Sequence, residues 1–262
     1  MLKISRSVEG KNARNPGYGD IQVLLERLLV EVVSANYRYF TQEVLVHSQS
    51  VADAQRWCWP PLLSNELQLS GLVGHALSAV CPVSLPEEPI SRKQSKEDAD
   101  ERTAPASRSG RADFYGRYGQ RSIALELKRS SMSTAGKGQF EISKKKWAAV
   151  ETQAQQALVH MRSRSHEKGL YGHPVGIGLL VTRMGRVVVP GEDEAKTLSD
   201  AAAEFTDAST KLMQTLKPDF FATYRPPAEM QITEGWDETK SGVKIFPGVT
   251  FAARVRVHSR GN

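Results

Sequence analysis

The stretch from Ser109 to Lys128 reads SGRADFYGRYGQRSIALELK, and it decides how the middle of the chain is expected to fold. Two apolar, β-prone runs flank the segment Gly116–Gly119, which predicts a β-hairpin. Side chains alternate between the two faces of a strand. Glu126 and Lys128 are therefore expected to share one face of the second strand, inside a run that is otherwise apolar.

Pairing of the two strands would bring two carboxylates together. If the strands pair around Arg117 and Ser122, Asp113 lies opposite Glu126. Mg²⁺ is typically held by one or two carboxylates together with substrate phosphate and water. Lys128 would then orient or deprotonate an attacking water, or neutralise charge that develops on the phosphate. This arrangement predicts cleavage of phosphodiester bonds.

A Glu-x-Lys triplet has little weight by itself, because about one is expected in a chain of this length. Three further triplets are present: Glu9-Gly-Lys11, Glu194-Ala-Lys196 and Glu238-Thr-Lys240. Those three lie in polar or acidic stretches with no apolar strand around them. Only the triplet at 126–128 also follows an Asp on a preceding β-like run, so it is the one expected to carry chemistry.

The composition is that of a basic globular protein. The chain has 262 residues, a formal net charge of +6 and a pI of about 9.3, enough for one large domain or two small ones. A basic surface favours an anionic partner, most simply nucleic acid. Cys58 and Cys81 are far apart and are expected to be reduced core residues. With no signal peptide and no membrane-spanning run, a cytoplasmic protein without a membrane partner is predicted.

Apolar spacing and β-branched runs predict the remaining elements. Helices are expected at about 20–33, 62–80, 144–162 and 199–216, and strands at 37–46, 175–182, 187–189 and 220–224. The segment 82–110 has few large apolar residues and is expected to be a mobile loop, either lying over a substrate or forming plain surface.

The C-terminal segment 242–258 is expected to form two strands broken at Pro247-Gly248. Arg254, Arg256 and His258 alternate along the second of these strands and are expected to point outward. Such a basic edge would either contact a nucleic-acid backbone or protect an edge strand from aggregation.

Glu66 allows two interpretations. At about 100° per residue it falls within the apolar stripe of the helix at 62–80, where a carboxylate needs a partner, a metal or a functional reason. Alternatively, it lies in a frayed first turn, where an acidic side chain suits the helix dipole and reaches water.

Basic residues follow the triplet and suggest contacts with phosphate. Arg129, Lys137 and the run Lys144-Lys145-Lys146 lie close after it in sequence. Three lysines at a helix start are unfavourable for the helix dipole unless an anion is near. The alternative is a solvated charged face. Of Gln153, Gln155 and Gln156 in the same helix, at most one is expected to point toward the site.

The residues and their order resemble the PD-(D/E)xK phosphodiesterase superfamily, which includes many type II restriction enzymes and related repair nucleases. The matching residues are Asp113, which follows Gly110-Arg111-Ala112, and the triplet Glu126-Leu127-Lys128 at the end of the next strand. The resemblance covers about 62–182. It departs from the family pattern at Ala112, where a Pro would precede the Asp.

The resemblance implies an α/β fold of the restriction-endonuclease type, with a mixed central β-sheet flanked by α-helices. It implies Mg²⁺, with Mn²⁺ as a substitute, held by Asp113, Glu126 and the Leu127 carbonyl. It further implies that Lys128 positions the nucleophilic water and that Glu66 is the helix-borne acidic residue of many members. Arg111 joins Arg129 and the four lysines as an expected nucleic-acid contact.

The function expected on these grounds is a metal-dependent nuclease that hydrolyses phosphodiester bonds in DNA, an endonuclease of restriction, phage defence or repair. Two alternatives are a non-catalytic nucleic-acid-binding or assembly protein on the same fold and an RNA-directed nuclease. The expected organisation is an N-terminal segment at 1–61, a nuclease-like core at 62–225 and a C-terminal β extension at 226–262. A homodimer or a partner protein within a larger complex would fit cleavage of both strands.

Overall fold

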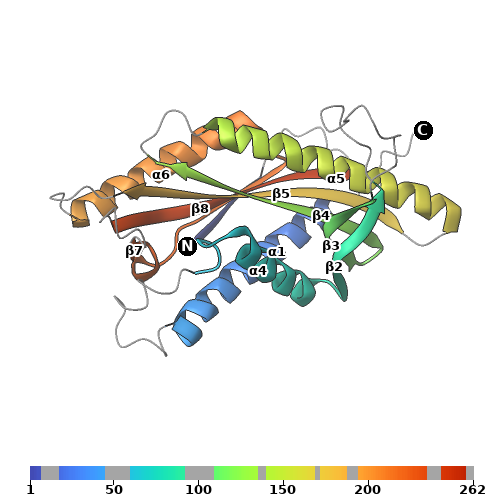
Figure 1. Ribbon diagram of the computed structural model, residues 1–262, viewed down its shortest axis with the longest axis horizontal. Coiled ribbons are helices and arrows are strands. Elements are labelled where there is room, and N and C mark those ends of the chain that lie inside the picture. The colour runs from blue at the N-terminus through green and yellow to red at the C-terminus, as the bar shows by residue number, and fades with distance from the viewer. Residues whose placement is uncertain are drawn as a thin grey trace, which may run out of the picture.

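The computed structural model describes residues 1–6, 18–44, 60–91, 109–134, 140–168, 172–187, 194–234 and 243–257. A mixed sheet of eight strands runs through the molecule, and helices cover both of its faces (Figure 1). The strand order is β1-β6-β8-β5-β4-β3-β2, and the short strand β7 pairs with β8 beside this path. The protein is therefore of the α/β class, as the sequence predicts.

The bounds of the elements are as follows. The strands are β1 (Leu2–Arg6), β2 (Val83–Ser91), β3 (Ser109–Tyr118), β4 (Arg121–Ser133), β5 (His173–Val187), β6 (Phe220–Tyr224), β7 (Ile232–Glu234) and β8 (Val243–Val257). The α-helices are α1 (Tyr18–Arg38), α4 (Glu66–Val80), α5 (Phe140–Lys168) and α6 (Glu194–Leu216). A π-helical segment (Tyr39–Val44) follows α1, and a short 3-10 turn (Ala228–Met230) precedes β7.

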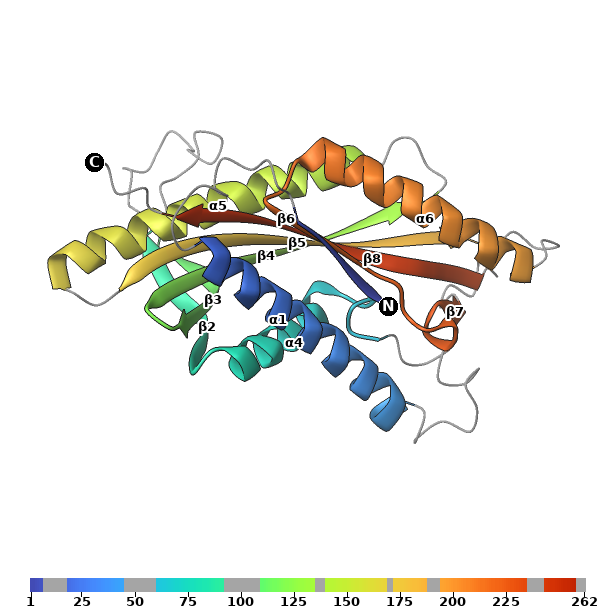
Figure 2. The same ribbon diagram turned by 180° about the vertical axis from the view of Figure 1, so that it is seen from behind.

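Two helical layers enclose the sheet. Helices α1 and α4 cover one face, and α5 and α6 cover the other, in both views (Figures 1 and 2). Leu125 and Leu127 of β4 pack into the core with α1 and α4, whereas Leu180 and Met184 of β5 pack with α5 and α6. The period-2 alternation of a strand thus decides which helical layer each side chain meets.

The predicted hairpin forms between β3 and β4. These strands are antiparallel, and Arg117 pairs with Ser122, as expected from the sequence. The turn lies at Gly119 and Gln120, where Gly119 has a φ of +56°, a conformation that only glycine adopts at little cost. The register of the hairpin is therefore confirmed.

Helix α5 connects β4 to β5, which run parallel to each other. Apolar residues at helical spacing make its buried face: Trp147, Val150, Ala154, Ala157, Leu158 and Met161. A Cβ on Gly176 of β5 would lie 2.3 Å from the Ala154 carbonyl oxygen, and one on Gly178 would lie 2.9 Å from that of Val150. These two glycines therefore let the helix backbone lie against the sheet.

Two predicted segments have a different structure. The strand expected at 37–46 is wrong, because α1 continues to Arg38 and the π-helical segment follows it. Asn36 is buried and accepts a hydrogen bond from the Leu62 N–H at 3.0 Å, a contact between distant parts of the chain. The loop expected at 82–110 is also wrong for its first part, since β2 pairs with β3 along 83–91. Residues 92–108 lie outside the described residues.

The C-terminal segment forms one strand and not two. β8 runs through Pro247-Gly248 without a break and lies between β5 and β6, so it is not an edge strand. Its register with β5 shifts between Met184 and Arg186, opposite the Pro247-Gly248 segment. Arg254 and Arg256 do not point outward but contact Glu151 of α5. His258 lies outside the described residues.

Strands from all three predicted segments of the chain share one sheet. β1 pairs with β6, and β8 pairs with β5, β6 and β7.

β5 also runs continuously to Val187, so the strand expected at 187–189 is not separate within the described residues. Cys81 is a buried free thiol, as expected, and Cys58 lies outside the described residues. None of the described helices is long and apolar enough to cross a membrane.

Candidate active site

Strands β3 and β4 part immediately beside Asp113. Their ladder runs from the pair Tyr118–Arg121 to the pair Phe114–Leu125. Beyond this point β3 stays paired with β2, and β4 stays paired with β5 as far as Ser133. Continued by one residue, the same register places Asp113 beside Glu126, at the start of the gap between the strands.

The Asp113 side chain spans this gap. Its Oδ2 accepts a hydrogen bond from the Leu127 N–H at 2.7 Å. The N–H and C=O of one residue in an extended strand point toward the same neighbouring strand. The Leu127 carbonyl therefore faces the side of β4 on which the Asp113 carboxylate lies.

Glu126 and Lys128 share the face of the sheet that α5 covers. Ala124 packs with Ala157 and Met161 of α5, and Ser130 hydrogen-bonds through its hydroxyl to Ser143 of α5 at 2.8 Å. The even-numbered residues of β4 therefore face this helix, as the alternation predicts. Glu126 is fully buried and Lys128 is half-buried.

Helix α5 adds polar side chains over the same region. Lys146 and Gln153 are seven residues apart, or about two helical turns, and both are half-buried. The Gln153 Oε1 is shielded from solvent and has no hydrogen-bond partner among the described residues. Gln155 is exposed, so of the three glutamines considered Gln153 is the one with an unsatisfied buried oxygen.

Glu66 lies on α4 and not on the strands that carry Asp113, Glu126 and Lys128. It is exposed in the first turn of α4, which Asn65 caps by accepting a hydrogen bond from the Gln68 N–H at 2.9 Å. Its carboxylate acts on Arg129, whose pKa it raises against the larger lowering effect of burial. The interpretation that places Glu66 on a buried face is therefore wrong. Glu66 lies in the first turn and reaches water, as the alternative expects, but this turn is capped by Asn65 and not frayed.

The basic residues are spread over several environments. Helix α5 begins at Phe140, so Lys144-Lys145-Lys146 lie beyond its first turn, and the expectation of lysines at a helix start is wrong. Lys144 forms an ion pair with Glu141 at 2.5 Å, and Lys145 is exposed. Lys137 and the side chain of Arg111 lie outside the described parts of the structure. Arg183, which no motif in the sequence marks, lies near Arg129.

A groove borders Asp113 on the side of α4. The α4–β3 groove has a volume of about 560 Å³, and its walls include Ser70 and Gly74 of α4, Leu85 of β2, and Asp113 and Phe114 of β3. Asp113 is thus part of the wall of this groove as well as of the gap between β3 and β4.

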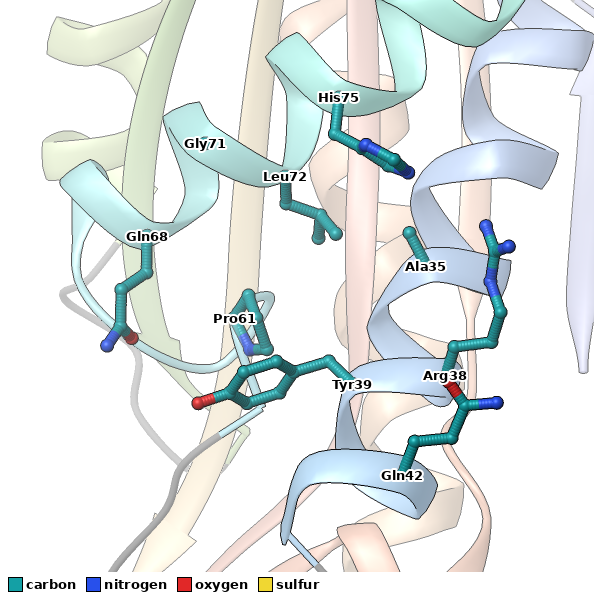
Figure 3. A pocket seen from close by; sticks show the side chains of 9 residues that line it. All are labelled: Ala35, Arg38, Tyr39, Gln42, Pro61, Gln68, Gly71, Leu72 and His75. Carbon is teal, nitrogen blue, oxygen red and sulfur yellow. The ribbon is translucent and has the colours of Figure 1, made fainter.

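A second groove lies on the other side of α4. The α1–α4 groove, of about 540 Å³, is lined by Arg38, Tyr39 and Gln42 on one side and by Gln68 and His75 of α4 on the other (Figure 3). The α1–α4 groove includes none of the predicted site residues, so the candidate site is assigned to the gap and groove that border Asp113.

Within the described parts of the chain, no three His, Cys, Asp or Glu side chains come together to hold a metal ion. The candidate donor set at the gap is two carboxylates and one backbone carbonyl. Comparisons of the chain with protein-family models, with curated proteins and with solved structures gave no significant match.

Proposed function

We propose that the protein is a metal-dependent nuclease that hydrolyses phosphodiester bonds in DNA, with a fold of the restriction-endonuclease type. The observation that carries the proposal is the Asp113 carboxylate at the Leu127 amide, where β3 and β4 part and Glu126 and Lys128 follow. The order α4-β2-β3-β4-α5-β5, with an antiparallel meander and a parallel strand after a helix, supports it.

The side chains at the gap fit a hard divalent cation. Mg²⁺ is usually bound through one or two carboxylates, with substrate phosphate and water completing its shell. A carboxylate offers about four lone-pair positions, so the bond from Leu127 leaves Asp113 capacity for a cation. Glu126 and the Leu127 carbonyl would supply the other protein oxygens. When bound, the ion would polarise the phosphate and make water a better nucleophile.

Lys128 is the base or positioning group in this proposal. Lys128 is half-buried and lies two residues after Glu126 on the same face of β4. There it would hold the attacking water or neutralise charge on the phosphorane-like transition state. Water would attack the phosphorus and the 3′-oxygen would leave, which gives a 5′-phosphate and a 3′-hydroxyl.

Cleavage of plasmid and single-stranded DNA with Mg²⁺, Mn²⁺ or EDTA tests the proposal. Asp113→Asn, Glu126→Gln and Lys128→Ala are each expected to reduce the rate by about 10²-fold or more, because each removes a group that acts on the reacting phosphate. Asp207→Asn and Lys211→Ala, at an exposed ion pair on α6, are the matched controls and should keep full activity.

The outcomes separate the alternatives. Metal-dependent cutting that survives the three site substitutions would exclude this site. A folded wild type that binds DNA and cuts neither substrate would favour a non-catalytic assembly protein or a nuclease that needs a partner. Equal cleavage of matched RNA and DNA oligonucleotides would show that the nuclease is not specific for DNA.

A further inference from the structure

Arg129 and Arg183 form a pair of guanidinium groups beneath the start of α4. β4 and β5 are parallel, and Ser131 is the register partner of Arg183, so Arg129 is its diagonal neighbour two residues earlier. Both arginines stand at odd-numbered positions that continue the apolar rows of Leu127 and Val181. They therefore share the α4 face of the sheet, the face opposite that of Lys128.

Neighbouring groups hold Arg183 in place. Its Nε donates to the Ser131 hydroxyl at 2.9 Å, and its Nη1 donates to the Leu63 carbonyl. Its guanidinium lies over the Phe246 ring, 5.2 Å from the ring centre. Burial and the positive charge of Arg129 lower the pKa of Arg183 to about 10. Arg183 is thus a fixed cation beside a second one.

Arg129 is less well satisfied. Its Nε and Nη2 are shielded from solvent and have no hydrogen-bond acceptor among the residues that the structure describes. Buried donors left without acceptors are costly, and for a charged group the cost is larger. Burial lowers the pKa of Arg129, and the carboxylate of Glu66 partly opposes this effect. Glu66 itself is exposed, in the first turn of α4.

We propose that Arg129 and Arg183 bind a phosphate group of a nucleic acid, and that Glu66 competes with this phosphate for Arg129. A phosphate presents several acceptor oxygens to the planar forks of two guanidinium groups, so one phosphate can bind both arginines at once. The net charge of +6 favours the approach of such a ligand. The identity of the ligand rests on the proposed function, whereas the binding step does not require cleavage.

The test is binding of a 3′-fluorescein-labelled single-stranded DNA oligonucleotide in EDTA, followed by fluorescence anisotropy. Arg129→Gln should weaken binding roughly tenfold, because a charge-assisted contact is lost. Glu66→Gln should tighten binding by about threefold, because a competing charge is removed. Arg38→Gln and Glu31→Gln change the same charges at an exposed pair on α1 and should change affinity far less.

Oligonucleotides that carry a 5′-phosphate or a 5′-hydroxyl distinguish the source of the phosphate. A loss in Arg129→Gln that is confined to the 5′-phosphorylated strand assigns the site to a strand end, and an equal loss with both assigns it to the backbone. Both assignments require that the site binds free phosphate. Inorganic phosphate should therefore displace the strand from wild type at a lower concentration than from Arg129→Gln.

Thermal unfolding separates this proposal from a purely structural role. A structural ion pair between Arg129 and Glu66 would make both single substitutions lower the Tm and leave DNA affinity equal to that of wild type, and this result would overturn the proposal. If cleavage depends on Asp113 but Arg129→Gln and Glu66→Gln both bind DNA as tightly as wild type, the phosphate site is rejected and the proposed nuclease activity stands.

Discussion

Arg254 of β8 donates a hydrogen bond from Nε to the Glu151 carboxylate of α5 at 2.5 Å. Its Nη1 donates to Asp219 at 3.1 Å, and its guanidinium lies over the Trp147 ring at 5.3 Å from the ring centre. Asp219 is only 5% exposed and also accepts from the Val255 N–H at 2.9 Å. The arginine thus joins α5 to β8 inside the molecule.

Loss of this arginine should destabilise the protein. Arg254→Met would leave the buried Asp219 carboxylate with one partner fewer, and the free energy of unfolding is expected to fall by about 2–4 kcal/mol. Urea unfolding measures the change. Lys211→Met, at an exposed pair with Asp207, should cost no more than about 0.5 kcal/mol. Similar small losses in both variants would show that Arg254 contributes only a surface ion pair.

The contact of α5 with β5 depends on Gly176. A Cβ there would lie 2.3 Å from the Ala154 carbonyl oxygen, and backbone cannot move aside as a flexible side chain can. Gly176→Ala is expected to lower the free energy of unfolding by about 2–3 kcal/mol or more. Gly71→Ala is the control, since outside its chain neighbours and its own helix backbone nothing lies within 4 Å of its Cβ position, and it should be neutral or gain about 0.5 kcal/mol. Equal Tm values for the two variants would contradict this packing.

Tyr18 makes stability sensitive to high pH. Its hydroxyl donates to the Asp219 carbonyl at 2.9 Å, and burial, followed by the charge of Asp219, raises its pKa to about 12. The unfolded chain loses this proton near pH 10, so the contribution is complete below about pH 10 and is lost as pH rises through about 12. Burial also raises the pKa of Tyr224.

The alkaline loss is measured by urea unfolding between about pH 9 and pH 11.5. Tyr18→Phe is expected to be less stable near neutral pH, because the hydrogen bond is absent, and to lose less stability as pH rises. Tyr39→Phe, at an exposed residue, should follow the wild-type curve. A Tyr18→Phe curve parallel to that of wild type would rule out this residue as the source.

Binding of a cation at Asp113 should raise the Tm without any substrate. With Mn²⁺ well above its Kd, the wild type is expected to gain roughly 3–6 °C, because the ion binds the folded state alone. Asp113→Asn should lose this gain, since an amide oxygen is a weaker ligand than a carboxylate, and Asp207→Asn should keep it. A gain retained in Asp113→Asn would place the ion elsewhere.

Cys81 should be protected from alkylation while the protein is folded. Burial raises the pKa of its thiol to about 11, and only the thiolate reacts. Iodoacetamide at about pH 8 should therefore modify Cys81 slowly in the native protein and rapidly in urea. Mass spectrometry of the peptide containing Cys81 gives the two rates, and equal rates would mean that this part of the core opens readily.

The sequence by itself determined the local features of this protein. The alternation of apolar and polar residues placed Glu126 and Lys128 on one face of β4, and the turn residues set the pairing of Arg117 with Ser122. The helical spacing of the apolar residues gave the buried face of α5 between Trp147 and Met161. These features depend on neighbours within a few residues, where the geometry of a strand or helix leaves little choice.

Only the tertiary structure decided the features that depend on distant partners. β2 forms within 83–91, despite Pro86 and Pro89, because β3 offers it an edge on which to pair. β8 passes through Pro247 as one strand because β5 and β6 enclose it, and the same burial turns Arg254 toward Glu151. Glu66 and Arg129 come together only when α4 packs on the sheet. The physical reason is that a backbone or charged group takes its final partner from whichever segment the packed core brings beside it, and sequence spacing carries no record of that choice.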